Sequence, residues 1–215
     1  MTIYDFKKSQ KFLYSPDDRI SIVDVPAMTF IMVDGQGDPN TSEEYAKAVE
    51  LLYGLAYAIK MAKISETTPP GYHDFVVPPL EGLWDLDINE YRGGPIPDKS
   101  RFSWTMMLRL PDFVTDEVFK AAQASVSKKK PGLDTSLSRL ETFTEGLCGQ
   151  ILHMGPYDDE PTSIAELQQY IVQAGFREDM TGIMKHHEIY LSDPRRTEPA
   201  KLKTILRHPI TSDIT

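Results

Sequence analysis

The strand-like segment at residues 186–191 carries the side chains best suited to chemistry. It reads His-His-Glu-Ile-Tyr-Leu, and alternate side chains of a strand share a face, so Glu188 would lie beside His186 and Tyr190. A carboxylate within a strand is costly to bury unless it is paired. In a cleft we expect its pKa to rise towards the range of a general acid or base. The same spacing fits a solvated residue at a sheet edge, so the pattern alone does not decide.

Other motifs of the chain are better explained without chemistry. Gly35-Gln36-Gly37 lacks the third glycine and the Lys-Ser/Thr pair of a phosphate-binding loop, which favours a turn. In His186-His187-Glu188, neighbouring strand residues point to opposite faces and cannot all reach one ion, so we expect neither a metal nor a cofactor. The single cysteine, Cys148, excludes an intramolecular disulfide and lies in an apolar stretch typical of a core residue.

The elements that position Glu188 are expected to occur twice. Residues 26–39 and residues 149–161 each run from an apolar segment through glycine into a helical pattern. Each half then reaches an acidic strand segment, and this alignment makes Asp74 the first-half counterpart of Glu188. Two units related by pseudo-twofold symmetry leave a cleft between them, where a carboxylate from one half can meet residues of the other.

The local patterns predict where these elements begin and end. Thr41 and Glu44 have the spacing of a capping box, and an apolar stripe follows from Tyr45 to Ile59. Thr115 is expected to cap a further helix, while Pro161 suits the first turn of another that ends at Gly175. We expect strands at residues 22–33, 72–77, 101–110, 147–154, 186–191 and 203–207, and an exposed loop at 89–100.

A β-α-β-β order used twice predicts an α+β fold with an antiparallel sheet. Its helices are expected on one face, which leaves the other face able to form the cleft. We expect a single domain over the whole chain, in which residues 1–20 form an arm, 21–112 the first repeat, 113–132 a connecting helix and 140–210 the second repeat.

Composition and charge restrict the partners. The chain has 215 residues, 40% of them hydrophobic and 26% charged, which is ordinary for a soluble globular protein. A net charge of −9 argues against nucleic acid, because phosphate binding needs a basic surface. No apolar run approaches a membrane span, and the N-terminus has no signal-peptide pattern, so we expect a cytoplasmic protein without a membrane partner. The sequence leaves monomer and homodimer open.

Several blocks in fixed order resemble one family. They are Pro79-Leu80-Glu81-Gly82-Leu83-Trp84, Leu110-Pro111-Asp112-Phe113-Val114, His153-Met154-Gly155-Pro156-Tyr157-Asp158-Asp159-Glu160-Pro161 and Glu188-Ile189-Tyr190-Leu191-Ser192-Asp193-Pro194-Arg195. Together they resemble the stand-alone GyrI-like small-molecule-binding proteins over nearly the whole chain. The resemblance implies a ligand cleft between the repeats, with Glu188 as its buried glutamate. In the related effector-binding domains of multidrug-responsive regulators, the equivalent carboxylate faces aromatic, often cationic drugs.

The blocks at residues 79–82 and 157–159 look like a subset that hydrolyses the strained cyclopropane of DNA-alkylating cyclopropanoid compounds. Such a reaction needs a base for water and a donor near the carbonyl oxygen. By this resemblance Glu188 activates the water, and either Tyr157 or Tyr190 donates. Expected aromatic walls are Trp84, Trp104, Tyr72, Phe75, Tyr53 and Tyr57. Aromatic residues in such a fold are more often core than wall, which applies to Tyr53 and Tyr57 in particular, whereas Trp84 and Trp104 fit either role.

Two questions stay open at this point. Glu81 is either a strand-end cap or a second acid in the cleft. The function is either hydrolysis that detoxifies an electrophilic aromatic compound or sequestration of planar aromatic or cationic drugs without turnover. Inhibition of a DNA-processing enzyme by protein contact has the least support, because no interaction patch stands out.

Overall fold

The computed structural model describes residues 3–17, 19–64, 68–85, 99–182 and 184–212 of the chain. Antiparallel strands form one large sheet with the order β1-β6-β9-β8-β3-β4-β2-β5, and β7 pairs with β9. The strands are β1 (Ser21–Val25), β2 (Met28–Gln36), β3 (Leu80–Asp85), β4 (Ser103–Arg109), β5 (Ser138–Phe143), β6 (Gly146–Met154), β7 (Phe176–Glu178), β8 (His186–Tyr190) and β9 (Lys203–Ser212).

Two similar three-stranded groups meet at the centre of this sheet. β3-β4-β2 comes from the first half of the chain and β8-β9-β6 from the second. The central strands β3 and β8 pair antiparallel, with Gly82 opposite Glu188, Trp84 opposite His186 and Leu80 opposite Tyr190. The predicted α+β fold with a repeated unit and an antiparallel sheet is therefore confirmed.

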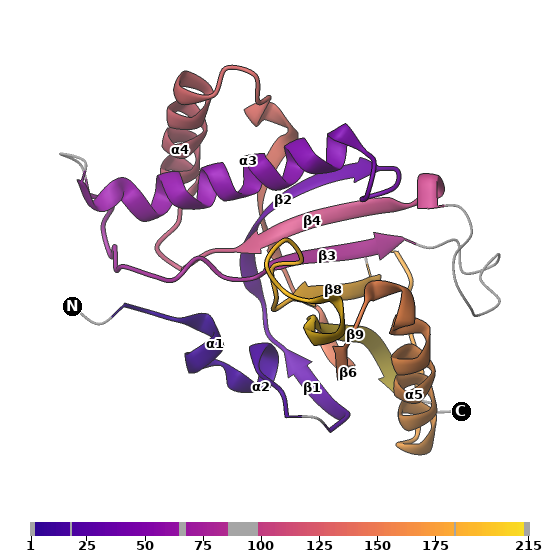
Figure 1. Cartoon of the computed structure of the whole chain (residues 1–215). Coiled ribbons are helices and arrows are strands. Elements are labelled where there is room, and N and C mark those ends of the chain that lie inside the picture. The colour runs from indigo at the N-terminus through magenta and orange to yellow at the C-terminus, as the bar shows by residue number, and fades with distance from the viewer. Residues whose placement is uncertain (1–2, 18, 65–67, 86–98, 183, 213–215) are drawn as a thin grey trace.

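The longer helices pack around this sheet (Figure 1). They are α3 (Glu43–Lys60), α4 (Asp116–Lys129) and α5 (Glu160–Gln173), and two short helices, α1 (Phe6–Ser9) and α2 (Lys11–Tyr14), form the N-terminal arm. Single 3-10 turns are η1 (Met61–Ile64), η2 (Lys99–Arg101), η3 (Thr135–Leu137), η4 (Tyr157–Asp159) and η5 (Pro199–Lys201). No helix in the described ranges is long and apolar enough to cross a membrane.

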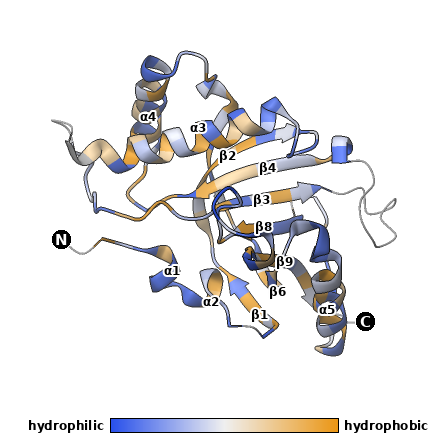
Figure 2. Cartoon of the chain, viewed as in Figure 1, coloured by the Kyte–Doolittle hydropathy of each residue, from blue (hydrophilic) through white to orange (hydrophobic). Residues whose placement is uncertain are grey.

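α3 and α5 cover the same face of the sheet, each over its own half. α3 packs on β2 and β4, and both strands include hydrophobic residues (Figure 2). α5 packs on β6, and Gly149 permits a close approach, because a Cβ there would lie 2.8 Å from Ile171. α4 packs against α3. The start of α3 differs from the prediction by one residue: Ser42, and not Thr41, accepts the hydrogen bond from the Tyr45 amide.

The opposite face of the sheet is covered by the N-terminal arm. Leu13 and Tyr14 are buried there, and the backbone of the arm is bonded to the sheet. Gln150 donates to the carbonyl oxygen of Phe12 at 2.6 Å, and Arg207 donates to that of Leu13 at 3.0 Å. The arm therefore fills this face, so the expected ligand cleft cannot lie here.

The first repeat departs from the predicted strand positions. Residues 72–77 form only an isolated bridge, from Phe75 to Tyr4, and the strand that pairs with β8 is β3. Prolines at 78 and 79 lack the N–H groups that a ladder needs, so the strand begins after them. Strand β5 was not predicted, and residues 89–98 of the expected loop lie outside the described residues.

Candidate functional site

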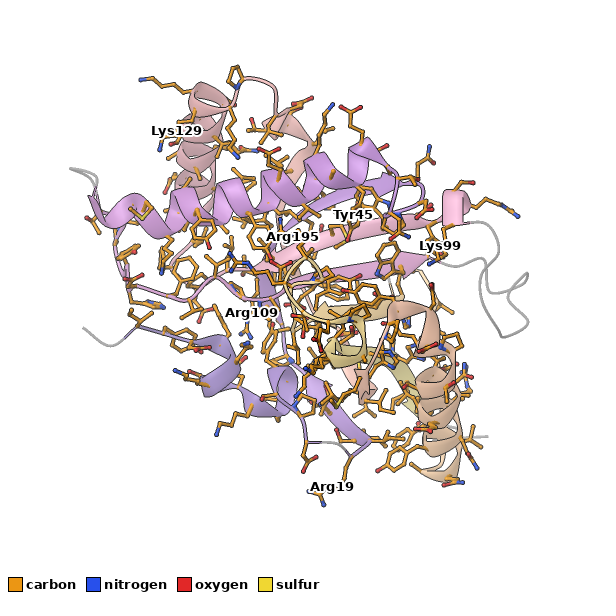
Figure 3. All side chains as sticks on the ribbon, viewed as in Figure 1. Arg19, Tyr45, Lys99, Arg109, Lys129 and Arg195 are labelled. Carbon is orange, nitrogen blue, oxygen red and sulfur yellow. The ribbon has the colours of Figure 1, made fainter. Side chains whose placement is uncertain are left out.

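A cleft of about 1150 Å³ lies on the helix-covered face, between α3, the start of α5 and the central strands β3 and β8. The prediction that the helix-free face forms the cleft is wrong, because the two helices flank it and the arm fills the other face. α3 contributes Tyr45, Tyr53 and Tyr57, and the floor carries Glu188. Tyr45 points from α3 towards the sheet (Figure 3). The volume is sufficient for a drug-sized ligand.

Glu188 is held by its β8 neighbours Tyr190 and His186, and Tyr190 is bonded in turn to the first repeat. Tyr190 donates its hydroxyl proton to Oε2 of Glu188 at 2.6 Å, and the Trp84 indole N–H donates to the Tyr190 oxygen at 2.9 Å. On the other side, Nε2 of His186 lies 3.2 Å from Oε1 of Glu188. The predicted shared face of these three β8 residues is confirmed, and Trp84 of β3 ties it to the first repeat.

Gly82 explains how Trp84 reaches across the strand. It lies opposite Glu188, and a Cβ at this position would approach the indole nitrogen of Trp84 to 2.9 Å and the sulfur of Met106 to 3.0 Å. The absence of a side chain therefore leaves room for the indole to lie over the strand. By the paired register, Gly82 and not Asp74 is the counterpart of Glu188. Asp74 instead accepts a hydrogen bond from Lys60 at 2.8 Å.

A second acid, Glu160, lines the same cleft from the first turn of α5. It is only 6% exposed, and its Oε1 atom has no hydrogen-bond partner among the described residues. Burial, aided by the nearby charge of Glu188, raises the pKa of Glu160 to about 10. Its carboxyl group is therefore protonated at neutral pH and can act as a donor. The helix start at this position was predicted, but the site role of Glu160 was missed.

Aromatic rings form the walls above this floor. Tyr45 stacks on Trp84 with ring centroids 6.2 Å apart, and Tyr157 meets Tyr190 edge to face at 5.8 Å. Phe102 meets Trp84 edge to face, with ring centroids 5.6 Å apart. Burial raises the pKa of Tyr157 to about 12, so its hydroxyl stays protonated. Tyr45 was missed as a wall because it continues the apolar stripe of α3 and looks like an ordinary core residue in sequence.

Three other aromatics expected in the walls lie elsewhere. Trp104 is buried in a second layer, where its ring meets the edge of Tyr45 at 5.3 Å. Tyr72 donates to the carbonyl oxygen of Lys60 at 2.6 Å. Phe75 is fully buried. None of the three lines the described cleft.

Glu81 lies on the opposite face of β3, in a cluster of buried charges that we call the buried ion cluster: Glu81, Glu145, His187 and Arg207. His187 lies 3.1 Å from each of the two carboxylates, and Arg207 donates to Glu145 at 3.1 Å. Glu81 is thus neither a strand-end cap nor an acid of the cleft. Burial opposes the charge of Glu145, but His187 and Arg207 outweigh it and hold the pKa of Glu145 at about 2.

Glu160, His186 and Glu188 also bring three atoms of metal-ligand type within 4.8 Å of one another. Nε2 of His186 and Oε1 of Glu188 are already in hydrogen-bond contact. We therefore treat the group as a hydrogen-bonded acid–base cluster. Cys148 is buried away from it, and burial raises the pKa of its thiol, as expected of a core cysteine.

Comparison with known proteins gives a consistent picture. The GyrI-like small molecule binding domain family matches residues 19–210. A conserved protein from Listeria innocua is 49% identical, with a TM-score of 0.90 over 97% of this chain and 100% of that one. A hydrolase from the same organism is 48% identical, with a TM-score of 0.89 over 98% of this chain and 100% of that one. The C-terminal domain of EcmrR shares the fold at 12% identity and a TM-score of 0.52, over 90% and 98% of the chains. Among proteins with curated functions, none matches.

Proposed function

Because the chain belongs to the GyrI-like small molecule binding domain family, we propose that its cleft binds a planar, electrophilic aromatic compound and hydrolyses a strained ring in it. The substrate class is the cyclopropanoid DNA-alkylating compounds. The observation that carries this proposal is the pairing, in one aromatic cleft, of Glu188 with a second, protonated acid, Glu160. Acid and base side by side are what ring opening by water requires.

Binding is supported by the walls. Tyr45, Trp84 and Phe102 offer flat apolar surface to a polycyclic ligand. An aromatic group that buries about 150–250 Å² gains roughly 4–6 kcal/mol at about 25 cal/mol per Å². Such a gain favours lipophilic planar compounds and is independent of ligand charge.

The chemical step uses the two acids in different states. Water attacks a ring carbon, and Glu188 accepts a proton from that water as the new C–O bond forms. The ring C–C bond breaks, and its electron pair moves through the conjugated dienone to the carbonyl oxygen, which takes a proton from Glu160. Glu188 then releases its proton to solvent and Glu160 takes one up, so the net change is the addition of one water molecule to the substrate. General-base assistance is worth roughly 10²–10⁴-fold, and one donor at a developing oxyanion roughly 10²–10³-fold.

The tyrosines have separate roles in this scheme. The Tyr190 hydroxyl proton is committed to Glu188 while its oxygen accepts from Trp84, so Tyr190 positions the base. Tyr157 lines the cleft and keeps its proton at neutral pH, so it is the tyrosine able to donate to a ligand. The Listeria innocua relatives described as hydrolases, 48% identical, support turnover over binding alone.

The alternative function is sequestration of planar cationic drugs. Glu188 beside aromatic rings is the observation that favours it, because a carboxylate and π-faces together attract a cation. Loss of the Glu188 charge would then weaken the binding of a cationic dye by roughly 0.5–2 kcal/mol, while a neutral ligand would keep its affinity.

The test is incubation of the purified protein with a cyclopropanoid alkylator in ¹⁸O-labelled water, with the ring-opened product followed by mass spectrometry. We expect labelled product from the wild type, and a fall in kcat of at least roughly 100-fold in Glu188→Gln with ligand binding kept. The matched control is Glu166→Gln, an exposed glutamate of α5. Saturable binding without product from the wild type would reject hydrolysis and leave sequestration.

A further inference from the structure

Behind the floor of the cleft, a line of hydrogen bonds runs from Glu188 to the edge of the sheet. Nε2 of His186 lies 3.2 Å from Oε1 of Glu188, and Nδ1 of His186 lies 2.6 Å from Nε2 of His208. Nδ1 of His208 is bonded to Oε1 of Glu178 on β7. The side chains of His186 and His208 are 8% and 2% exposed, while Glu178 is 23% exposed. The scheme above does not use these three residues.

The proton positions in this line of hydrogen bonds can be assigned by starting from Glu178, at its outer end. Burial opposes the charge of Glu178, yet the His208 hydrogen bond holds the pKa of Glu178 below its usual range. The ionised carboxylate only accepts, so Nδ1 of His208 carries the proton. Burial lowers the pKa of His208, so this ring is neutral and its Nε2 accepts. Nδ1 of His186 must then donate to it.

The inner end of the line therefore requires a further proton. With its Nδ1–H given to His208, a neutral His186 would present a bare Nε2 lone pair to Oε1 of Glu188, and two acceptors at 3.2 Å repel. One proton must lie between them. Tyr190 already donates to Oε2 of Glu188, which favours the carboxylate form, and the negative charge of Glu178 favours the imidazolium form of His186.

We propose that Glu178 and His208 are positioning residues that hold this shared proton on His186, so that Glu188 stands ionised in the cleft as the base. The catalytic consequence of this arrangement rests on the hydrolysis proposed above, whereas the proton positions do not depend on it. During turnover Glu188 takes a proton from the attacking water and is restored when that proton leaves to solvent. The imidazolium of His186 opposes protonation of Glu188 throughout.

Other charged and titratable groups face this line from the elements around it, and the test must allow for them. They are Glu160 at the start of α5, Tyr157 in η4, Tyr190 on β8, Tyr45 on α3, Lys99 in η2, and Glu145 before β6. The test therefore changes one charge at the outer end, in Glu178→Gln, and leaves the groups that touch the ligand in place.

The direct test is a long-range ¹H–¹⁵N spectrum of the ligand-free protein with ¹⁵N-labelled histidine, assigned with His186→Gln and His73→Gln. We expect His208 to carry one proton, on Nδ1, and His186 to carry protons on both nitrogens at neutral pH. Glu178→Gln should remove the second proton from His186, whereas Asp179→Asn, which removes the same charge one residue away, should leave it. A His208 ring protonated at Nε2, or a singly protonated His186 in the wild type, overturns the proposal.

The kinetic test separates positioning from structure. In Glu178→Gln the proton moves to Glu188, so we expect kcat near neutral pH to fall about tenfold with KM little changed, and the acid limb of the pH–rate profile to move up by about one pH unit. High pH should restore activity in this variant. An unshifted profile rejects the proposal. The proposal is also rejected if a chelator abolishes the activity and zinc restores it, because a metal ion would then lie between His186 and Glu188. If no turnover occurs at all, hydrolysis fails while the spectra still decide the proton positions.

Discussion

Raising the pH should remove the proton of His187 from the buried ion cluster and so destabilise the protein by a calculable amount. Burial alone would lower the pKa of His187, but Glu145 and Glu81 outweigh it and raise the pKa from 6.5 to about 9. The folded state therefore binds this proton more tightly than the unfolded state does. The stabilisation is fully present below pH 6.5 and is lost as the pH rises through 9. At 1.36 kcal/mol per pKa unit this amounts to about 3 kcal/mol, a large share of the roughly 5–15 kcal/mol that stabilises a domain.

The acid side of the same cluster has the opposite sign. The pKa of Glu145 falls from 4.5 to about 2 on folding, because the positive charges of His187 and Arg207 outweigh the burial of the carboxylate. Its stabilisation is therefore present above pH 4.5 and is lost as the pH falls through 2. The cluster contributes most between pH 4.5 and 6.5.

The assay is urea unfolding of the wild type and His187→Gln, just below pH 6.5 and at pH 9. The pKa of Glu160 is also raised, so its deprotonation likewise destabilises the folded protein as the pH rises. The quantity to compare is therefore the difference in unfolding free energy between the wild type and the variant. We expect the variant to be roughly 3–5 kcal/mol less stable at the lower pH, since it leaves buried carboxylates with too little positive charge. The difference should narrow by about 3 kcal/mol at the higher pH. The control His73→Gln changes an exposed ring. A pH-independent difference between wild type and variant would refute a charged His187.

Two substitutions in the cleft test its geometry. Gly82→Ala would place a Cβ 2.9 Å from the Trp84 indole nitrogen and displace the ring, so we expect affinity for a planar ligand to fall about tenfold, at roughly 1.4 kcal/mol. Fluorescence titration checks this, and Gly132→Ala, where nothing lies within 4 Å, should change neither affinity nor fold. Glu160→Gln preserves a neutral polar side chain where the pKa of the acid is about 10, so ligand affinity should persist while kcat falls roughly 10²–10³-fold. An unchanged kcat in this variant would remove Glu160 as the donor.

The parts of the fold that follow from local chemistry could be predicted. The periodic apolar stripe of α3, the Thr115 cap of α4 and the proline in the first turn of α5 each depend on residues close in sequence. Alternation along β8 placed Glu188 beside His186 and Tyr190 for the same reason. These predictions required no knowledge of which strands pair.

The parts that failed depend on long-range register. Strand β3 pairs with β8, and no local pattern indicates that pairing. The error of several residues moved the supposed counterpart of Glu188 from Gly82 to Asp74. It also left the direction of Glu81 open, because parity along β3 decides whether that carboxylate faces the cleft or the arm. Glu160 was missed because an acid at a helix start has a sufficient local explanation.

The correct counterpart shows how a repeated unit makes an asymmetric site. β2 and β6 are both nine residues long, and the two groups of strands have matching order, yet the central pair carries Gly82 on one strand and Glu188 on the other. Two glutamates at these positions would repel each other across the pair, and a side chain at 82 would displace Trp84. The second repeat therefore supplies the charge while the first supplies the space and the indole. That division places the Glu188 carboxylate, bonded to Tyr190, which Trp84 holds in turn, in a cleft whose aromatic walls come partly from the other half of the chain.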